Sequence, residues 1–299
     1  MTNITPEKAL KMLRDTGGGL CDVTGESDDS LLSSFEPVSV YSFSSQIPPD
    51  NVFFWLEQPE KYGSRPPHLQ GTQDCVSHSF GFGLEDWYLN QCQFWPGKVA
   101  TEVLYGGSRV LIGEKKLAIK GTYCSWVANF ILRYGYLPRG SYVGEDLVEY
   151  NPMKADRYGR DGLPNVIPGL MTKVLNPDTT KPVRLGKLPT AEAAWSAVGQ
   201  KCPVPFATKR GFDSTRGYFG ICKPQGEWKH SMLVRGRCIV ASGAMCFAVQ
   251  NSIGDYLGEE NREVTLLSGR KVLLPAGVFL VEFDVFDDIC KTEDSYVLF

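Results

Sequence analysis

Two stretches that lie far apart in the chain decide the fold. Residues 69–80 read LQGTQDCVSHSF, and residues 230–254 begin with HSMLV and end with AVQNSIG. In the first stretch Cys75 opens an apolar segment, and in the second His230 and Asn251 each stand in a strand-like run. A cysteine followed much later by a histidine and then an asparagine is the order found in Cys-His-Asn hydrolases.

The chemistry of a cysteine nucleophile sets what each of these residues must do. A thiol attacks a carbonyl carbon as the thiolate, but a cysteine with the ordinary pKa of about 8.5 is mostly protonated at neutral pH. The positive end of a helix and a neighbouring imidazolium both lower that pKa. We therefore expect Cys75 to begin a helix and His230 to face it from a sheet, with Asn251 accepting a hydrogen bond from the second ring nitrogen. The backbone N–H of Cys75 and the side chain of Gln70 are the expected donors to the oxyanion.

The motifs around these residues resemble those of the papain-like (C1-type) cysteine peptidases. Gln70-Gly71 stands shortly before the cysteine, His230-Ser231-Met232 matches the histidine motif, and Asn251-Ser252-Ile253-Gly254 is similar to the family's Asn-Ser-Trp-Gly. Residues 104–109 and 274–279 are similar to stretches of phage and bacterial members. The resemblance covers about residues 65–299.

This resemblance implies an α+β, papain-like two-lobe fold, with a helical lobe carrying the Cys75 helix and a β-sheet or barrel lobe carrying His230 and Asn251. It also implies a cysteine hydrolase that cleaves peptide or isopeptide bonds of a peptide or protein substrate through an acyl-enzyme on Cys75. His230 would act as base and then acid, Asn251 would orient it, and Gln70 would donate to the oxyanion. The family implies no cofactor and no metal. An acyltransferase or amidase of the same fold is not separated by sequence.

The sequence departs from the family pattern at four positions. Gln70 lies five residues before Cys75, where the family has six, and Val76 and Ile253 stand where the family has tryptophans. The tryptophan at the second position normally shields the His-Asn hydrogen bond from water. Asp74 places a negative charge directly before the nucleophile, where it works against formation of a thiolate.

Composition indicates a globular chain with no strong electrostatic partner. The formal net charge of −3 argues against nucleic acid or an anionic membrane surface as the main partner. No apolar run approaches the roughly 18 to 20 residues of a membrane-spanning helix, and the N-terminus lacks the pattern of a signal peptide. We therefore expect a cytoplasmic or virion-associated protein. The nine cysteines form no CxxC pair, so all except Cys75 are expected to be small buried hydrophobes.

Periodicity divides the chain into three parts. Residues 1–60 are expected to form an N-terminal extension with a short helix at 6–14, residues 61–190 a mainly helical lobe, and residues 191–299 a β-rich lobe. Helices are predicted from about Cys75 to Gln91, from Tyr123 to Tyr134, and from the N-cap Thr190 to Val198. Separate strands are predicted at 204–206, 232–234, 238–241, 245–249, 264–267, 272–274 and 278–286.

The sequence leaves more than one role open for the remaining histidines. The three histidines are His68, His78 and His230. Cys75-x-x-His78 with Cys92 resembles part of a metal site, but no second ligand pair has zinc-like spacing, so His78 is expected to pack or hydrogen-bond on the nucleophile helix. Trp228, two residues before His230, is the aromatic residue expected to line the cleft.

A second function fits the departures from the family pattern. In that hypothesis the fold serves as a virion or tail component of a phage with weak or lost activity, and residues 1–50 form an arm that docks on other virion proteins.

Overall fold

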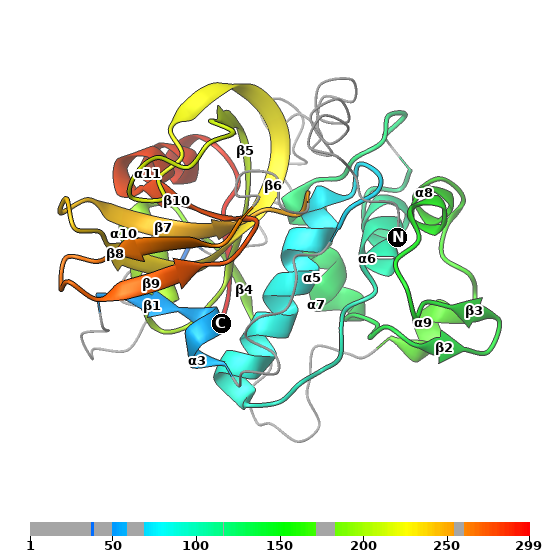
Figure 1. The fold of residues 1–299 in the computed structure, drawn as a ribbon. Helices are drawn as coiled ribbons and strands as arrows, with labels where there is room; N and C mark the ends of the chain where they lie inside the picture. Colours follow the sequence, from blue (N-terminus) through cyan, green and yellow to red (C-terminus); the bar gives the residue numbers. More distant parts are fainter. Residues whose placement is uncertain (1–36, 39–49, 59–68, 116, 172–182, 254–259) are drawn as a thin grey trace.

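A single helix, α5 (Cys75–Trp87), runs between a helical lobe and a β lobe (Figure 1). The computed structural model describes residues 37–38, 50–58, 69–115, 117–171, 183–253 and 260–299. The helix expected at 6–14 and the side chain of His68 lie outside these residues. All 13 residues of α5 are buried, because the helix is packed from both sides. The α+β architecture with two lobes that is expected from the sequence is confirmed.

Helix α5 begins where the sequence predicts, and its two glycines explain how it can be so crowded. A Cβ atom added at Gly81 would lie 2.9 Å from the Thr101 side chain, and one at Gly83 would lie 3.4 Å from Leu233. Glycine costs about 1 kcal/mol relative to alanine inside a helix. Here the absence of a side chain at both positions allows α6 (Thr101–Gly107) and the β lobe to approach the helix backbone closely.

The helical lobe is built from α6, α7 (Cys124–Tyr134), α8 (Pro152–Asp161) and α9 (Ile167–Leu170), with a small hairpin of β2 (Ser141–Tyr142) and β3 (Glu145–Asp146). Helix α7 confirms the helix predicted from the sequence. Helix α8 begins at Pro152, where the Asn151 side chain accepts hydrogen bonds from the backbone N–H groups of Met153 and Lys154. Such a cap satisfies donors that the helix cannot satisfy itself.

The β lobe is an antiparallel sheet in the order β1-β6-β7-β10, and β5 also pairs with β6, on the edge opposite β7. The bounds of these strands are β1 (Val52–Phe53), β5 (Val204–Phe212), β6 (Pro224–Ile239), β7 (Met245–Gln250) and β10 (Val278–Glu282). Strand β1 pairs with β6, so the sheet includes residues from the segment expected to be an extension.

Strand β6 corrects one prediction from the sequence. The two runs 232–234 and 238–241 were expected to be separate strands, but they belong largely to one strand of 16 residues. The two arginines between them, Arg235 and Arg237, suggest a break, yet each is only 1% exposed. Arg235 pairs with Asp86, and Arg237 donates to the Trp195 carbonyl. Distant partners therefore allow both charges to lie inside a continuous strand.

The end of the chain corrects a second prediction. The apolar run 278–286 was expected to be one strand, but β10 ends at Glu282 and helix α11 (Phe283–Thr292) follows. Helix α10 (Ala191–Gly199) confirms the third predicted helix, including its cap, because the Thr190 hydroxyl accepts from the Ala193 N–H. Two small antiparallel pairs complete the lobe: β8 (Arg262–Thr265) with β9 (Lys271–Leu274), and β4 (Leu185–Lys187) with β11 (Tyr296–Leu298).

Hydrophobicity along the helices gives no candidate for a membrane-spanning segment: within the described residues, none combines the required length with the required apolar character.

Candidate active site

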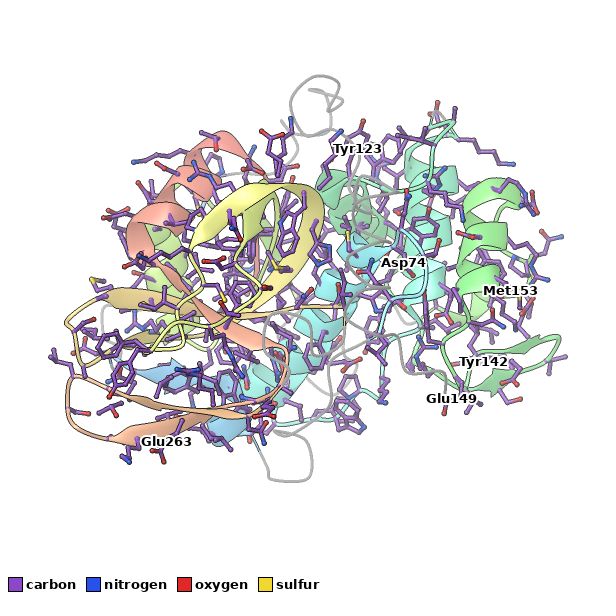
Figure 2. The ribbon with its side chains drawn as sticks, turned by 45° about the horizontal axis from the view of Figure 1, so that its top comes forward. Asp74, Tyr123, Tyr142, Glu149, Met153 and Glu263 are labelled. Carbon is purple, nitrogen blue, oxygen red and sulfur yellow. The ribbon has the colours of Figure 1, made fainter. Side chains whose placement is uncertain are left out.

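Cys75 is the first residue of α5, at the end of the helix that lies between the two lobes. Asp74 occupies the N-cap position but does not cap the helix with its side chain. Figure 2 shows Asp74 near the middle of the molecule, between the lobes. The helix N-terminus supplies the partial positive charge that a thiolate needs. The Cys75 side chain is fully buried.

The strand that carries His230 is attached to α5 at two points. One turn after Cys75, the hydroxyl groups of Ser79 and Ser231 lie 2.7 Å apart. Near the other end of the helix, Asp86 accepts two hydrogen bonds from Arg235, at 2.6 and 3.0 Å. Because Ser231 directly follows His230, these contacts set the position of the histidine relative to the start of α5.

His230 and Asn251 are brought together as the sequence predicts. His230 Nε2 lies 2.8 Å from Asn251 Oδ1. The backbone N–H of Ile253 donates to the same Oδ1 at 3.2 Å. Since a backbone N–H can only donate, this second contact identifies the atom as the amide oxygen. His230 Nε2 must therefore carry the hydrogen, and in the neutral ring Nδ1 carries a lone pair.

The state of His230 fits this assignment. The side chain is fully buried, and burial lowers its pKa to about 4, although the hydrogen bond to Asn251 opposes this shift. The charge of His78 adds to the lowering. The ring is therefore neutral at pH 7. Its Nδ1 accepts no hydrogen bond from the described residues, so it is available to take a proton.

Gln70 is tied to the asparagine motif. Its backbone N–H donates to the Ser252 carbonyl, and its side-chain Oε1 accepts from the Ser252 hydroxyl at 2.6 Å. The side-chain Nε2 donates to the Thr72 carbonyl at 3.1 Å. A carboxamide nitrogen has two hydrogens, so this bond uses one of them. Gln70 thus lies beside Ser252, the residue after Asn251, in spite of its shortened spacing from Cys75.

An indole lies beside the histidine, although Ile253 replaces the tryptophan of the family motif. The ring of Trp228 lies 5.4 Å from that of His230 in an edge-to-face arrangement. The two residues are two apart on β6, so their side chains lie on the same face of the strand. Phe212 packs behind Trp228 at 6.0 Å. An aromatic cover therefore reaches the histidine from a different element.

A cluster surrounds Asp74, and it contains His78, which is expected from the sequence to pack or hydrogen-bond on this helix, and Tyr150, which is not expected there. The Tyr150 hydroxyl donates to Asp74 Oδ2 at 2.9 Å, and His78 Nε2 lies 3.2 Å from the same oxygen. Tyr150 also accepts a hydrogen bond from the Gly71 N–H at 3.0 Å. The helical spacing of four between Asp74 and His78 could have indicated their contact. Tyr150 carries no such signal, because it lies 76 residues away.

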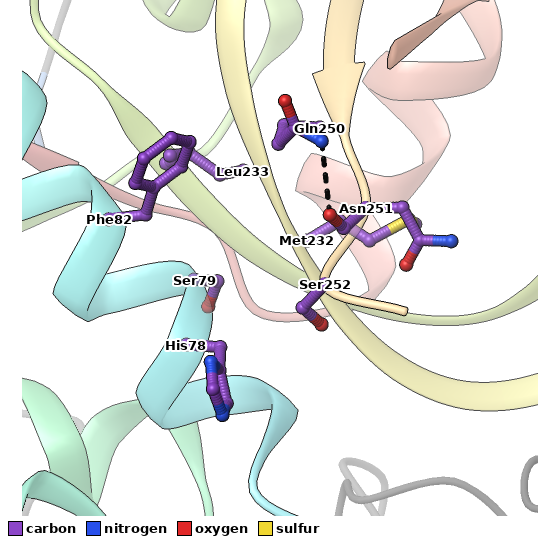
Figure 3. Close-up of a pocket in the computed structure, with 8 residues that line it drawn as sticks. All are labelled: His78, Ser79, Phe82, Met232, Leu233, Gln250, Asn251 and Ser252. Atoms are coloured by element: carbon purple, nitrogen blue, oxygen red, sulfur yellow. Dashed lines mark hydrogen bonds between the residues drawn. The ribbon is translucent and has the colours of Figure 1, made fainter. Parts of the chain in front are cut away.

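A small cavity lies between α5 and the sheet. Figure 3 shows a cavity with residues of α5 on one side and the end of β7 with the asparagine motif on the other. Its volume is about 10 Å³, close to the space that one water molecule needs. The cavity is lined by His78, Ser79, Phe82, Met232, Leu233, Gln250, Asn251 and Ser252. A peptide does not fit in a cavity of this size.

Four other cysteines contrast with a reactive thiol. Burial raises the pKa of Cys202, Cys222, Cys246 and Cys290 to about 12. These thiols are therefore protonated at neutral pH and react slowly. Within the described ranges, no group of three or more His, Cys, Asp or Glu side chains is arranged to hold a metal ion.

The fold is shared with solved cysteine proteases, although no protein-family model and no curated protein matches the sequence. Digestive procathepsin L 3 from the larval midgut of Tenebrio molitor is 17% identical with a TM-score of 0.59, and the match covers 98% of this chain and 78% of that one. Xylellain, a cysteine protease from Xylella fastidiosa, is 13% identical with a TM-score of 0.57, covering 95% and 96%. The proform of the ragweed pollen allergen Amb a 11, a cysteine protease, is 18% identical with a TM-score of 0.57, covering 98% and 76%. At these identities the likeness shows the papain-like fold.

Proposed function

We propose that the protein is a thiol hydrolase that cleaves peptide or isopeptide bonds through an acyl-enzyme on Cys75. The observation that carries this proposal is the hydrogen bond from His230 Nε2 to Asn251 Oδ1. It leaves the Nδ1 lone pair as the proton acceptor of a fully buried, neutral imidazole. A histidine held only for packing would not need this tautomer. The fold shared with solved cysteine proteases supports the same reaction class.

In the proposed reaction each residue has one role. His230 Nδ1 takes the thiol proton as the Cys75 sulfur attacks the carbonyl carbon, and the carbonyl electron pair moves to oxygen. The Cys75 N–H and the Gln70 amide donate to that oxyanion. The intermediate then expels the amine, which takes the proton from His230, and a thioester remains. Water, deprotonated by His230, attacks the thioester, and the thiol regains the proton as it leaves.

Asn251 orients the base throughout this cycle. Its oxygen holds the Nε2 hydrogen in the neutral ring and faces the same hydrogen when the ring is positively charged. Ile253 N–H fixes the amide so that it cannot rotate to present its NH₂ group. Removing this orientation would let the neutral ring place its hydrogen on Nδ1, where it cannot act as a base.

The test is site-resolved alkylation of the native protein with iodoacetamide from about pH 5 to 9, read by mass spectrometry. We expect Cys75 to react well below its ordinary pKa of about 8.5, because His230 Nδ1 takes the thiol proton during the attack, and we expect His230→Ala to abolish that advantage. Cys202, Cys222, Cys246 and Cys290 are internal controls, because burial raises their pKa to about 12. A Cys75 that labels no faster than these four in wild type would refute the proposal.

A second candidate function is favoured by the closed site. Cys75 and His230 are both fully buried, which suits a fold that serves as a structural component, such as a phage virion or tail protein, rather than an open enzyme. In that case Cys75 would behave like the other buried thiols, and the protein would sediment with an assembled particle. The alkylation experiment therefore separates the two candidates.

A further inference from the structure

Asp74 is an obstacle to the proposed chemistry, because a negative charge next to the nucleophile disfavours a second negative charge on sulfur. Its carboxylate is fully buried. Within the described residues, its Oδ1 atom accepts no hydrogen bond. A buried carboxylate with one unsatisfied oxygen is costly unless a cation or donors offset it. The structure therefore needs a partner for Asp74 at this point of the chain.

The partners are Tyr150 and His78, and both contact Oδ2. Burial holds the pKa of Tyr150 well above its ordinary value, and the charge of Asp74 adds to this effect. Tyr150 therefore stays protonated and acts as the donor to Asp74. It donates a hydrogen bond to the carboxylate, but it brings no positive charge. His78, 2% exposed and 3.2 Å away, is the member of the cluster that can carry a positive charge.

The other ionisable groups around Asp74 are paired or neutral, and the guanidinium of Arg109 donates its hydrogen bonds to backbone carbonyls. Glu102 of α6 pairs with Arg139 at 3.0 Å, and the Arg139 guanidinium lies 5.7 Å from the centre of the Tyr150 ring. Asp156 of α8 pairs with Lys120. Burial raises the pKa of Tyr105 of α6 to about 12, so its hydroxyl is protonated. His230 of β6 is neutral. Among the residues in view, His78 is thus left to offset Asp74.

We propose, resting on the thiol hydrolase function above, that His78 is a positioning residue that offsets the charge of Asp74 and, with Tyr150, holds that carboxylate so that the Cys75 thiolate can form. His78 lies one turn after the nucleophile on the same helix, and it lines the same small cavity as Asn251. The ring of Tyr150 packs edge-to-face on His78 at 4.9 Å, which keeps the imidazole over the carboxylate. In this cluster Asp74, which alone would disfavour the thiolate, becomes the negative member of an ion pair with His78.

The experiment is a double-mutant cycle read by the pH profile of Cys75 alkylation with iodoacetamide. His78→Gln leaves the Asp74 charge unopposed, so the apparent pKa of Cys75 labelling should rise by about one unit, equivalent to about tenfold slower labelling at pH 7. Asp74→Asn removes the charge and keeps an acceptor for Tyr150, so labelling at pH 6 should be as fast as in wild type or faster. The double variant Asp74→Asn/His78→Gln should return to within about threefold of wild type.

Rescue in the double variant distinguishes charge from packing. If His78 only fills space, the double variant will label as slowly as His78→Gln or more slowly, and the inference is overturned. If His78→Gln does not give a native near-UV circular dichroism spectrum, the Asp74→Asn variant alone tests the inference. Slower labelling of Cys75 in Asp74→Asn than in wild type at pH 6 would then contradict the idea that the Asp74 charge opposes the thiolate.

The same data separate this inference from the proposed function. A wild-type Cys75 that reacts quickly and depends on His230, together with a His78→Gln variant identical to wild type, overturns the role of His78 alone. A wild-type Cys75 that reacts no faster than the other buried thiols overturns both.

Discussion

Single atoms determine what the site can do. The Ile253 N–H identifies the amide oxygen of Asn251, the oxygen identifies the hydrogen on His230 Nε2, and that hydrogen leaves Nδ1 as the base. Donor and acceptor chemistry alone fixes this assignment. Ile253 keeps this role through its backbone, although its side chain is not the tryptophan of the family motif. The substituted side chain therefore does not disturb the geometry of the His-Asn pair.

His230 gives a pH dependence of stability that can be predicted. The pKa of His230 is about 4 in the folded protein and 6.5 in the reference state, so the folded state binds fewer protons than the unfolded state between these values. The stabilisation that comes from keeping His230 neutral is therefore complete above pH 6.5, and it is lost as the pH falls through 4. At most about 3 kcal/mol of unfolding free energy is involved. We expect urea unfolding at pH 7 and pH 4 to show a larger loss in wild type than in His230→Gln. Equal losses would contradict a neutral buried imidazole.

At the scale of elements, α5 and β6 form the framework of the site. The helix presents Cys75 at one end and Asp86 near the other, and the strand presents His230 and Arg235 at matching positions. The Arg235 guanidinium also lies 4.3 Å from the centre of the Phe82 ring, and Gln58 donates to Asp86 at 2.9 Å. The ion pair is therefore enclosed by hydrogen bonds and an aromatic face.

Breaking this ion pair should be costly. Arg235→Met leaves the buried Asp86 carboxylate without its cation, and we expect the free energy of unfolding to fall by about 3 to 5 kcal/mol. Arg210→Met is the matched control, because the Arg210–Asp288 pair is exposed on both sides and should change stability by less than about 1 kcal/mol. Urea unfolding of the two variants measures the difference. Similar small losses in both would show that the buried pair does not hold α5 to β6.

The same elements show what local sequence can and cannot predict. The patterns predicted α5, α7 and the capped α10, because each has its signals within one helix length. The sequence pattern predicts two strands where the structure has the single strand β6, because Arg235 and Arg237 look like surface charges. Their partners lie 149 and 42 residues away in the chain, where a local pattern does not reveal them. The motifs located Cys75, His230 and Asn251, whereas Tyr150 depends on how α8 and the loop before it pack against α5.

At the scale of the whole molecule, the two principal residues of the candidate site are enclosed. Cys75 is fully buried, and the adjacent cavity of about 10 Å³ does not admit a substrate. Reaction of Cys75 with any reagent therefore requires the thiol to become exposed, and a larger reagent requires a wider opening.

This closure predicts a dependence on reagent size. A dye-linked iodoacetamide should label Cys75 at least about tenfold more slowly than iodoacetamide, equivalent to about 1.4 kcal/mol of additional opening. Cys92, which is half-buried, should show a much smaller difference and serves as the comparison within the same sample. Mass spectrometry of both peptides at several times gives the two ratios. Equal ratios at Cys75 and Cys92 would mean that the site is open in solution.

The two attachments between α5 and β6 differ in strength, and this difference sets how the lobes can move. The hydroxyl contact of Ser79 with Ser231 is a single neutral hydrogen bond, whereas the pair of Asp86 with Arg235 is bidentate and charged. They are separated by seven residues of helix, or roughly 10 Å at 1.5 Å per residue. The weaker contact lies beside the nucleophile and the stronger one lies farther away, so we expect the lobes to pivot on the distant ion pair. The cleft then opens as a wedge, widest at Cys75.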